Sequence, residues 1–148
     1  MSTAVEVRSP RTEQEWQRYY DLRWRILRAP WQAHGPEREP DDDSSIHRML
    51  GTPDGAVLAV GRLHRLDAHT GQIRFMAVAG DQVRKGYGSR LLESLENAAR
   101  EMDLNEVILQ ARENAVPFYR HHGYEVAEKT FLLFDEIQHY LMRKRLQD

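Results

Sequence analysis

The residues whose types and spacing could do chemistry are concentrated in one glycine-containing loop, Val83-Arg-Lys-Gly-Tyr-Gly-Ser89. The loop follows an apolar segment expected to be a strand and precedes a regular helical stripe of apolar residues. Unpaired N–H groups and the positive dipole end at a helix N-terminus attract anions. Gly86 and Gly88 let the backbone approach an anion closely, and Arg84 and Lys85 add positive charge. The pattern predicts a cradle for phosphate or pyrophosphate.

Two familiar phosphate-binding motifs do not match this loop. A Walker A loop has the pattern G-x-x-x-x-G-K-[ST], and a dinucleotide fingerprint has G-x-G-x-x-G directly after a first strand. Here the third glycine is absent and the loop lies in the middle of the chain. A nucleotide hydrolase is therefore disfavoured, and a bare G-x-G is equally compatible with a tight turn that binds nothing.

Apolar periodicity predicts the elements that must position the loop. A capping box at Thr12 and Glu15 begins a first helix, which ends near Arg28. The second helix carries Glu96 and Arg100 one turn apart on its outer face, and the third helix is short. Strands are expected over residues 5–8, 46–50, 56–66, 72–78, 107–111, 124–131 and 137–144, and helices over 12–28, 91–102 and 114–122.

This order, β-α-βββ-α-β-α-ββ, predicts an α+β fold with one crossover unit in its middle. Residues 72–78 are apolar on both faces apart from Gln72 and Arg74, which indicates a central strand covered on both sides. The length predicts a single domain over residues 1–148.

Composition excludes several classes of function. Hydrophobic residues make up 41% and charged residues 30%, which is typical of a globular protein rather than a disordered one. The 21 Lys and Arg against 23 Asp and Glu lack the basic excess of a nucleic-acid binder. Cysteine is absent, which excludes disulfides, thiolate metal sites and cysteine nucleophiles, and no metal site is predicted. No leader or long apolar run is visible, so we expect a cytoplasmic protein without a membrane segment.

At the glycine loop the sequence resembles the GNAT acetyltransferase family. Its members have a Q/R-x-x-G-x-G/A loop after the fourth strand, and Val83 stands where Gln or Arg is usual. The segment Ala115-Val-Pro-Phe-Tyr-Arg-His-His-Gly-Tyr124 looks like the family's A-x-x-x-Y-x-x-x-G-F/Y segment. Arg112 falls where many members have an Asn that touches the cofactor arm, and whether Asn114 substitutes for that Asn is left open. The resemblance covers nearly all of the chain.

A narrower resemblance is to the acetyltransferase half of bacterial proteins in which a GNAT domain precedes a hot-dog, thioesterase-like domain. Its signals include Leu22-Arg-Trp-Arg-Ile-Leu-Arg28, Gly35-Pro-Glu-Arg-Glu39 and Ile73-Arg-Phe-Met-Ala-Val78. The chain as given ends at Asp148 without such a second domain.

The family resemblance implies a mixed, largely antiparallel sheet of about seven strands with helices on both faces. It also implies an N-acyltransferase that moves acetyl from acetyl-CoA, its cosubstrate, to an amine of a small molecule or protein by direct attack in a ternary complex. The alternative is a CoA-binding regulatory module with little activity. Besides acetyl-CoA and the unidentified acceptor, a homodimer is left open as a partner. The resemblance places the cofactor on Met76, Ala77, Val78, Val83, Arg84, Lys85, Gly86, Tyr87, Gly88, Ser89, Arg112 and Asn114.

Within this resemblance Tyr119 is the general acid that protonates the leaving thiolate, with packing on the sheet as the alternative. The oxyanion donor is a main-chain N–H near Ala77 or Val78, where the fourth strand splays from the fifth. The base candidates are Glu37 and Glu39 in an acidic loop, for which a merely solvated loop is the favoured alternative, and His139 on the last strand, for which an ordinary half-buried histidine is an equal alternative. Arg38 and Arg74 are candidates to hold an acidic group of the acceptor.

Overall fold

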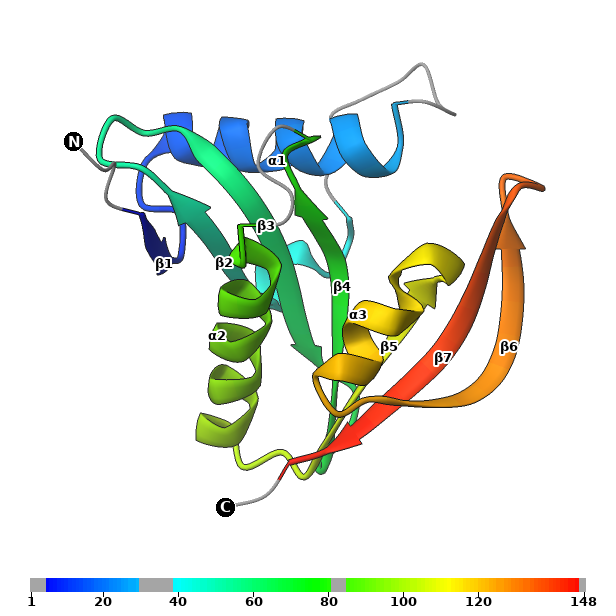
Figure 1. Ribbon diagram of the computed structural model, residues 1–148. Helices are drawn as coiled ribbons and strands as arrows, with labels where there is room; N and C mark the ends of the chain where they lie inside the picture. The colour runs from blue at the N-terminus through cyan, green and yellow to red at the C-terminus, as the bar shows by residue number, and fades with distance from the viewer. Residues whose placement is uncertain (1–4, 30–38, 81–84, 147–148) are drawn as a thin grey trace.

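The computed structural model of the protein describes residues 5–29, 39–80 and 85–146. Figure 1 shows one twisted sheet with helices on both sides. The strands are β1 (Glu6–Arg8), β2 (Ile46–Gly51), β3 (Val57–Arg65), β4 (Thr70–Val78), β5 (Glu106–Arg112), β6 (Glu125–Leu133) and β7 (Ile137–Arg145). The helices are α1 (Glu13–Leu27), α2 (Tyr87–Glu101) and α3 (Val116–His121), with single 3-10 turns at η1 (Asp42–Ser44) and η3 (Glu113–Ala115).

The seven strands lie in the order β1-β2-β3-β4-β5-β7-β6. Only the β4–β5 pair is parallel, and α2 makes the crossover between its two strands. The predicted fold class, strand number and element order are confirmed. Each predicted strand end lies within two residues of the observed one, and β4 is central as its apolar faces indicated.

The core has two layers because neighbouring residues of a strand face opposite sides of the sheet. Leu50 packs with the apolar stripe of α2, whereas its neighbour Met49 packs with Tyr19 and Leu22 of α1. Tyr119 of α3 belongs to the α2 layer. The sheet is therefore held between α1 on one face and α2 with α3 on the other. None of the described helices is long and apolar enough to cross a membrane.

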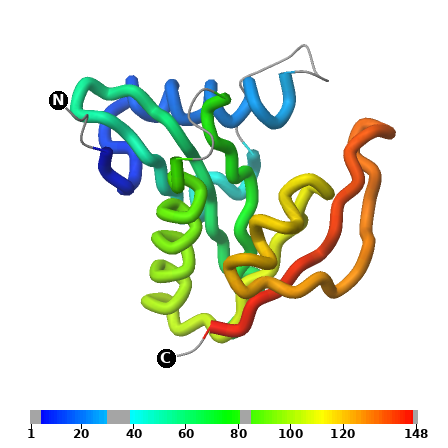
Figure 2. The backbone as a smooth tube through the Cα atoms, in the orientation of Figure 1, coloured from blue at the N-terminus to red at the C-terminus, as the bar shows by residue number. Residues whose placement is uncertain are grey.

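The two central strands separate at their C-terminal ends. β4 and β5 pair only from Thr70 and Glu106 to Ile73 and Leu109, and beyond that point they diverge, as Figures 1 and 2 show. A bulge sits at the point of divergence, where the register shifts between Val60 and Arg62 of β3. Phe75 in this bulge has a φ of 59°, a left-handed conformation that is uncommon for a bulky residue. The bulge and the splay open space between two strands that would otherwise be sealed together.

Two local predictions on the helices are wrong. Glu96 is not on an outer face: it is 5% exposed and accepts hydrogen bonds from Tyr124 Oη at 2.8 Å and Lys144 Nζ at 3.0 Å. Tyr124, just before β6, and Lys144 of β7 cover the side of α2 that helical spacing alone assigns to solvent. The short third helix begins later than residue 114, since Asn114 lies in the preceding 3-10 turn and α3 is capped at Ala115 without a side-chain hydrogen bond.

Candidate active site

The start of α2 has the glycine conformation and the unpaired helix-start N–H groups on which the predicted cradle depends. Gly86 precedes the helix with a φ of 80°, which glycine adopts without steric cost. The first helical hydrogen bond runs from the Arg90 N–H to the Gly86 carbonyl at 3.1 Å, so the N–H groups of Tyr87, Gly88 and Ser89 precede the helical ladder. A Cβ on Gly88 would lie 3.3 Å from the Phe118 ring, so a side chain there would fill the space in front of these amides.

A pocket of about 450 Å³, which we call the cradle pocket, lies against this helix start. Its lining is shared by the end of β4, the start of α2 and the helix α3. Seven of the predicted cofactor residues line it: Met76, Ala77, Val78, Gly86, Tyr87, Gly88 and Ser89. Of the other five, Lys85 and Asn114 are exposed and Arg112 lines a different pocket. Val83 and Arg84 lie outside the described residues.

The hydrogen bonds of β4 determine which of its amides faces the splay. The Ala79 N–H donates to the Leu58 carbonyl at 2.8 Å and therefore points toward β3. Successive N–H groups of an extended strand point in opposite directions, so the Val78 N–H points away from β3, into the gap beside β5. Of the two amides that the sequence predicted as oxyanion donors, Val78 is the one directed into the site.

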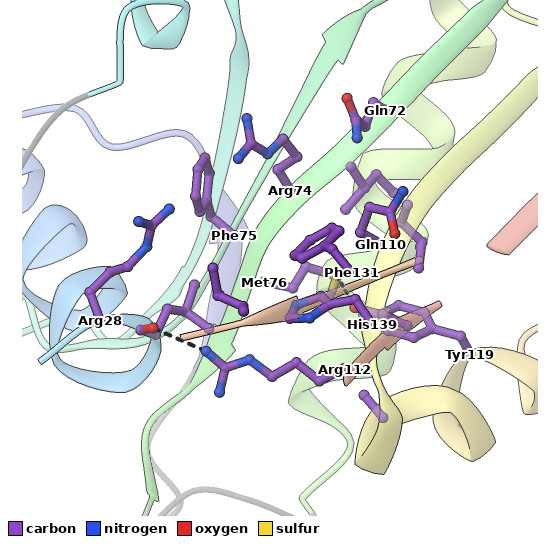
Figure 3. A pocket seen from close by; sticks show the side chains of 16 residues that line it. Arg28, Gln72, Arg74, Phe75, Met76, Gln110, Arg112, Tyr119, Phe131 and His139 are labelled. Atoms are coloured by element: carbon purple, nitrogen blue, oxygen red, sulfur yellow. Dashed lines mark hydrogen bonds between the residues drawn. The ribbon is translucent and has the colours of Figure 1, made fainter. Parts of the chain in front are cut away.

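A second pocket, of about 430 Å³, opens on the other side of Tyr119 (Figure 3). We call it the arginine pocket, because Arg28, Arg74 and Arg112 line it. Its walls come from the end of α1, the splayed parts of β4 and β5, and side chains of β6 and β7. Three residues, Met76, Ala115 and Tyr119, line both this pocket and the cradle pocket, so the two spaces meet there.

Tyr119 sits at the junction of the two pockets. Its hydroxyl lies 3.6 Å from the sulfur of Met76, and the residue is 8% exposed. Burial raises the pKa of Tyr119 well above its usual value near 10, so the phenol holds its proton at neutral pH. A buried, protonated hydroxyl between two cavities is able to donate a proton to a group that becomes negative there.

His139 lines the arginine pocket from β7 (Figure 3). Its Nδ1 lies 3.0 Å from the Ile137 carbonyl, which can only accept, so the neutral ring carries its proton on Nδ1 and keeps the lone pair on Nε2. The ring stacks on Phe131 with 4.4 Å between centroids. Burial lowers the pKa of His139 below 6.5, although the Ile137 hydrogen bond acts in the opposite direction. The imidazole is thus neutral at pH 7 and able to accept a proton.

The two carboxylate candidates for the base differ from His139 in position. Glu39 does not line the arginine pocket, and its carboxylate pairs with Arg28 at 3.4 Å. Glu37 and Arg38 lie outside the described residues. Among the described candidates, His139 is the one that shares a pocket with Tyr119.

Sequence reasoning named Arg74 but missed Arg28 and assigned Arg112 to the cofactor. Arg112 donates a hydrogen bond to the Leu27 carbonyl at 3.0 Å and so connects the end of α1 with β5. No motif carries this signal, because residues 28, 74 and 112 are brought together only by the splay of the sheet. Within residues 5–29, 39–80 and 85–146, no group of three or more His, Asp or Glu could hold a metal ion.

Comparisons with known proteins show which family and which solved structures this chain resembles. The model of the acetyltransferase (GNAT) family matches residues 16–124. A UPF0039 protein of Schizosaccharomyces pombe is 30% identical over 129 residues, which cover 86% of this chain and 85% of that protein. The uncharacterized N-acetyltransferase YjcF of Bacillus subtilis is 33% identical over 98 residues, 65% of this chain and 69% of that one. The crystal structure of a GNAT family acetyltransferase from Elizabethkingia anophelis with acetyl-CoA bound superposes with a TM-score of 0.73 at 15% identity, covering 97% of each chain.

Proposed function

The chain belongs to the GNAT acetyltransferase family, and we propose that it transfers acetyl from acetyl-CoA directly to an amine bound in the arginine pocket. The observation that carries the proposal is the meeting of the two pockets at Tyr119, Met76 and Ala115. One space has amides suited to a pyrophosphate, and the other has a histidine suited to accept a proton. Direct transfer requires two such spaces that share a wall at the reacting atoms.

The cradle pocket fits the acetyl-CoA side of the reaction. Its helix-start amides suit a pyrophosphate, and the missing Cβ of Gly88 leaves room for one in front of Phe118. Acetyl-CoA supplies an acetyl group activated as a thioester. The Val78 N–H is directed into the splay, where it can donate to the thioester oxygen as negative charge develops on it.

The arginine pocket fits the amine side. An ammonium group with a pKa near 10.4 must first lose a proton, which costs about 4.6 kcal/mol at pH 7 without assistance. His139 Nε2 accepts that proton, and the amine nitrogen then forms a bond to the acetyl carbon. The carbon–sulfur bond breaks, and the Tyr119 hydroxyl protonates the departing sulfur. The nitrogen bonded to the acetyl group then loses its second proton, which returns through solvent to Tyr119, and His139 releases the first proton to solvent, so both groups are restored and one proton is released in each turnover.

Several finer expectations stay predictions. These are the kinship with two-domain proteins that carry a hot-dog domain, a homodimer, and a cytoplasmic location. The choice between a small-molecule and a protein amine is likewise a prediction.

Release of free thiol from acetyl-CoA tests the proposal when it is measured with a broad panel of amines. We expect release that depends on the amine, with an equal amount of N-acetyl product. Intact mass measured with acetyl-CoA alone should show no acetylated protein, since the transfer is direct. Tight acetyl-CoA binding without amine-dependent release across the panel would contradict the proposal and favour a CoA-binding regulatory module.

A further inference from the structure

Four guanidinium groups surround the ring of Phe75, the bulge residue of β4. Their central carbons lie 4.4 Å (Arg74), 4.5 Å (Arg23), 5.0 Å (Arg62) and 5.7 Å (Arg28) from the ring centroid. An aromatic face attracts cations, but one ring cannot neutralise four charges. The structure must therefore balance these arginines with anions, and it does so unequally.

Arg23 and Arg62 are balanced within the protein. Arg23 donates to both oxygens of Asp42 at 3.0 and 2.9 Å, and Arg62 donates to Asp42 at 2.9 Å and to Asp41 at 2.7 Å. Asp42 is 2% exposed, and burial alone would raise its pKa. Hydrogen bonds from Arg23, the Glu39 N–H and Arg62 instead hold the pKa of Asp42 well below its usual range. This group is a closed ion-pair network under α1.

Arg74 is not balanced in this way. It is half-buried and forms no hydrogen bond or ion pair with any residue in the part of the chain that the structure describes. Burial lowers the pKa of Arg74 and the nearby positive charge of Arg62 lowers it further, whereas the charges of Glu39 and Asp41 act in the opposite direction without forming an ion pair with Arg74. A partly desolvated cation that contacts no anion is costly, which suggests that an anion from outside the chain completes this site.

The arginine pocket gathers further positive charge around Arg74. Arg28 and Arg112 line it as well, and no Asp or Glu stands among the described residues of the lining, although Glu39, outside it, pairs with Arg28 at 3.4 Å. Burial and the charge of Arg28 also lower the pKa of Arg112. In Figure 3, Arg28, Arg74 and Phe75 lie toward one end of the pocket and Tyr119 toward the other. Phe131 and the apolar side chains of Leu109 and Leu133 form much of the remaining wall.

We propose that the acceptor is an amine that also carries an anionic group, a carboxylate or a phosphate, bound by Arg74 together with Arg28 and Arg112. The proposal rests on the proposed function, since it names the substrate class of that same site. Guanidinium groups bind both kinds of oxyanion through paired N–H donors. An apolar spacer between the anion and the amine matches the wall between the arginines and Tyr119. The same three charges repel polycationic acceptors.

Matched pairs of amines test the proposal on the wild-type protein. The carboxylate arm compares ω-amino carboxylates of three to six carbons with their primary amides. The phosphate arm compares aminoalkyl phosphates with the corresponding amino alcohols. We expect kcat/KM to be at least about 10-fold higher for the anionic member of one arm, since a charged hydrogen-bonded contact is at stake. The arm with the larger ratio identifies the anion.

Arg74→Met removes the charge and keeps an aliphatic stem, and Arg143→Met is the matched control on the exposed face of β7. For the anionic amine we expect Arg74→Met to lower kcat/KM by roughly 10- to 100-fold, mainly through KM, with partial rescue by Arg74→Lys. Arg74→Met should lower kcat/KM for the neutral amide by a smaller factor, so that the preference for the anionic amine shrinks. Arg143→Met should alter neither. Melting temperature and acetyl-CoA affinity check that each variant is folded.

A binding measurement separates this proposal from the proposed function. Hexanoate, which lacks an amine, is titrated into the protein with CoA present, and hexanamide is the neutral control. Hexanoate binding that is lost in Arg74→Met supports the anion site even if no amine is acetylated. Equal binding of the two compounds excludes a carboxylate, and neutral amines acetylated as well as the anionic amines of both arms overturn the anionic acceptor and leave the acetyltransferase proposal standing.

Discussion

The cradle pocket and the arginine pocket share a wall but are built from different parts of the chain. The cradle pocket is lined mainly by residues 76–78 and 86–89, close together in sequence, and the donors in it that suit a pyrophosphate are backbone amides. The arginine pocket is lined by side chains from α1, β4, β5, β6 and β7. Backbone amides suit a ligand common to a whole family, whereas side chains from scattered elements can change from one member to the next. The difference predicts that substitutions in the arginine pocket change the acceptor while the cradle pocket keeps its ligand.

Blocking the cradle pocket should have the largest effect. Gly88→Trp places a ring where even a Cβ lies 3.3 Å from Phe118, so it excludes the ligand from the helix-start amides. We expect acetyl-CoA affinity to fall by at least about 10²-fold, because two or more charge-assisted hydrogen bonds are lost at about 1.5–3 kcal/mol each. Calorimetry measures the loss. Asn97→Trp, on the exposed face of the same helix, should bind normally, and unchanged affinity in Gly88→Trp would remove the cradle assignment.

The junction should show the next largest effect. Tyr119→Phe removes one hydroxyl and almost no volume, so acetyl-CoA affinity should survive. If the hydroxyl protonates the thiolate, kcat falls by roughly 10²-fold, about 2.7 kcal/mol in the barrier. The rate is measured at saturating acetyl-CoA with chemistry shown to be rate-limiting.

Tyr124→Phe is the matched control for Tyr119. Its ring centroid is 5.7 Å from that of Tyr119, but its hydroxyl donates to buried Glu96 at 2.8 Å and lines neither pocket. We expect Tyr124→Phe to lose about 1 kcal/mol of unfolding free energy and to keep its rate. The opposite pattern, a destabilised Tyr119→Phe with normal kcat, would make Tyr119 a packing residue.

The same difference explains what the sequence could predict. The cradle pocket could be predicted from the sequence because its glycines, the helix start and the preceding strand are adjacent in the chain. All of them lie within Met76–Ser89. The choice of the Val78 N–H over the Ala77 N–H as the candidate oxyanion donor could not be predicted from the sequence, since it depends on which amide pairs with β3. The arginine pocket depends on the splay of β4 from β5 and on the bulge at Phe75, and neither has a local sequence signal. Glu96 was misplaced for a related reason: helical spacing cannot foresee that β7 will cover that side of α2.

A smaller effect is expected at the base. The rate of the wild-type protein should rise with pH and flatten above the pKa of His139, because only the neutral imidazole accepts a proton. Burial lowers that pKa, so the rise should lie below pH 6.5. His139→Gln should abolish this rise and lower kcat by roughly 10-fold at about pH 8, where solvent supplies part of the deprotonated amine. A variant that keeps the wild-type pH profile would exclude His139 as the base.

The smallest effect is expected for Glu39→Gln, which sharpens the contrast between a group inside the arginine pocket and one at its edge. The Glu39 carboxylate pairs with Arg28 at 3.4 Å, and both side chains are about one-third exposed, a kind of pair that contributes little to stability. Removing its charge leaves Arg28 with less neutralisation, so KM for an anionic amine should stay the same or fall by up to about 3-fold, as expected for a weak charge interaction. The value of kcat and its rise with pH should be those of the wild type, and Asp43→Asn, in the nearby exposed turn, is the control for loss of one acidic charge. If Glu39→Gln instead lowers kcat by about 10²-fold and abolishes the rise of the rate with pH, Glu39 is the base, as expected for a positioned proton acceptor. His139 would then be a packing residue that stacks on Phe131.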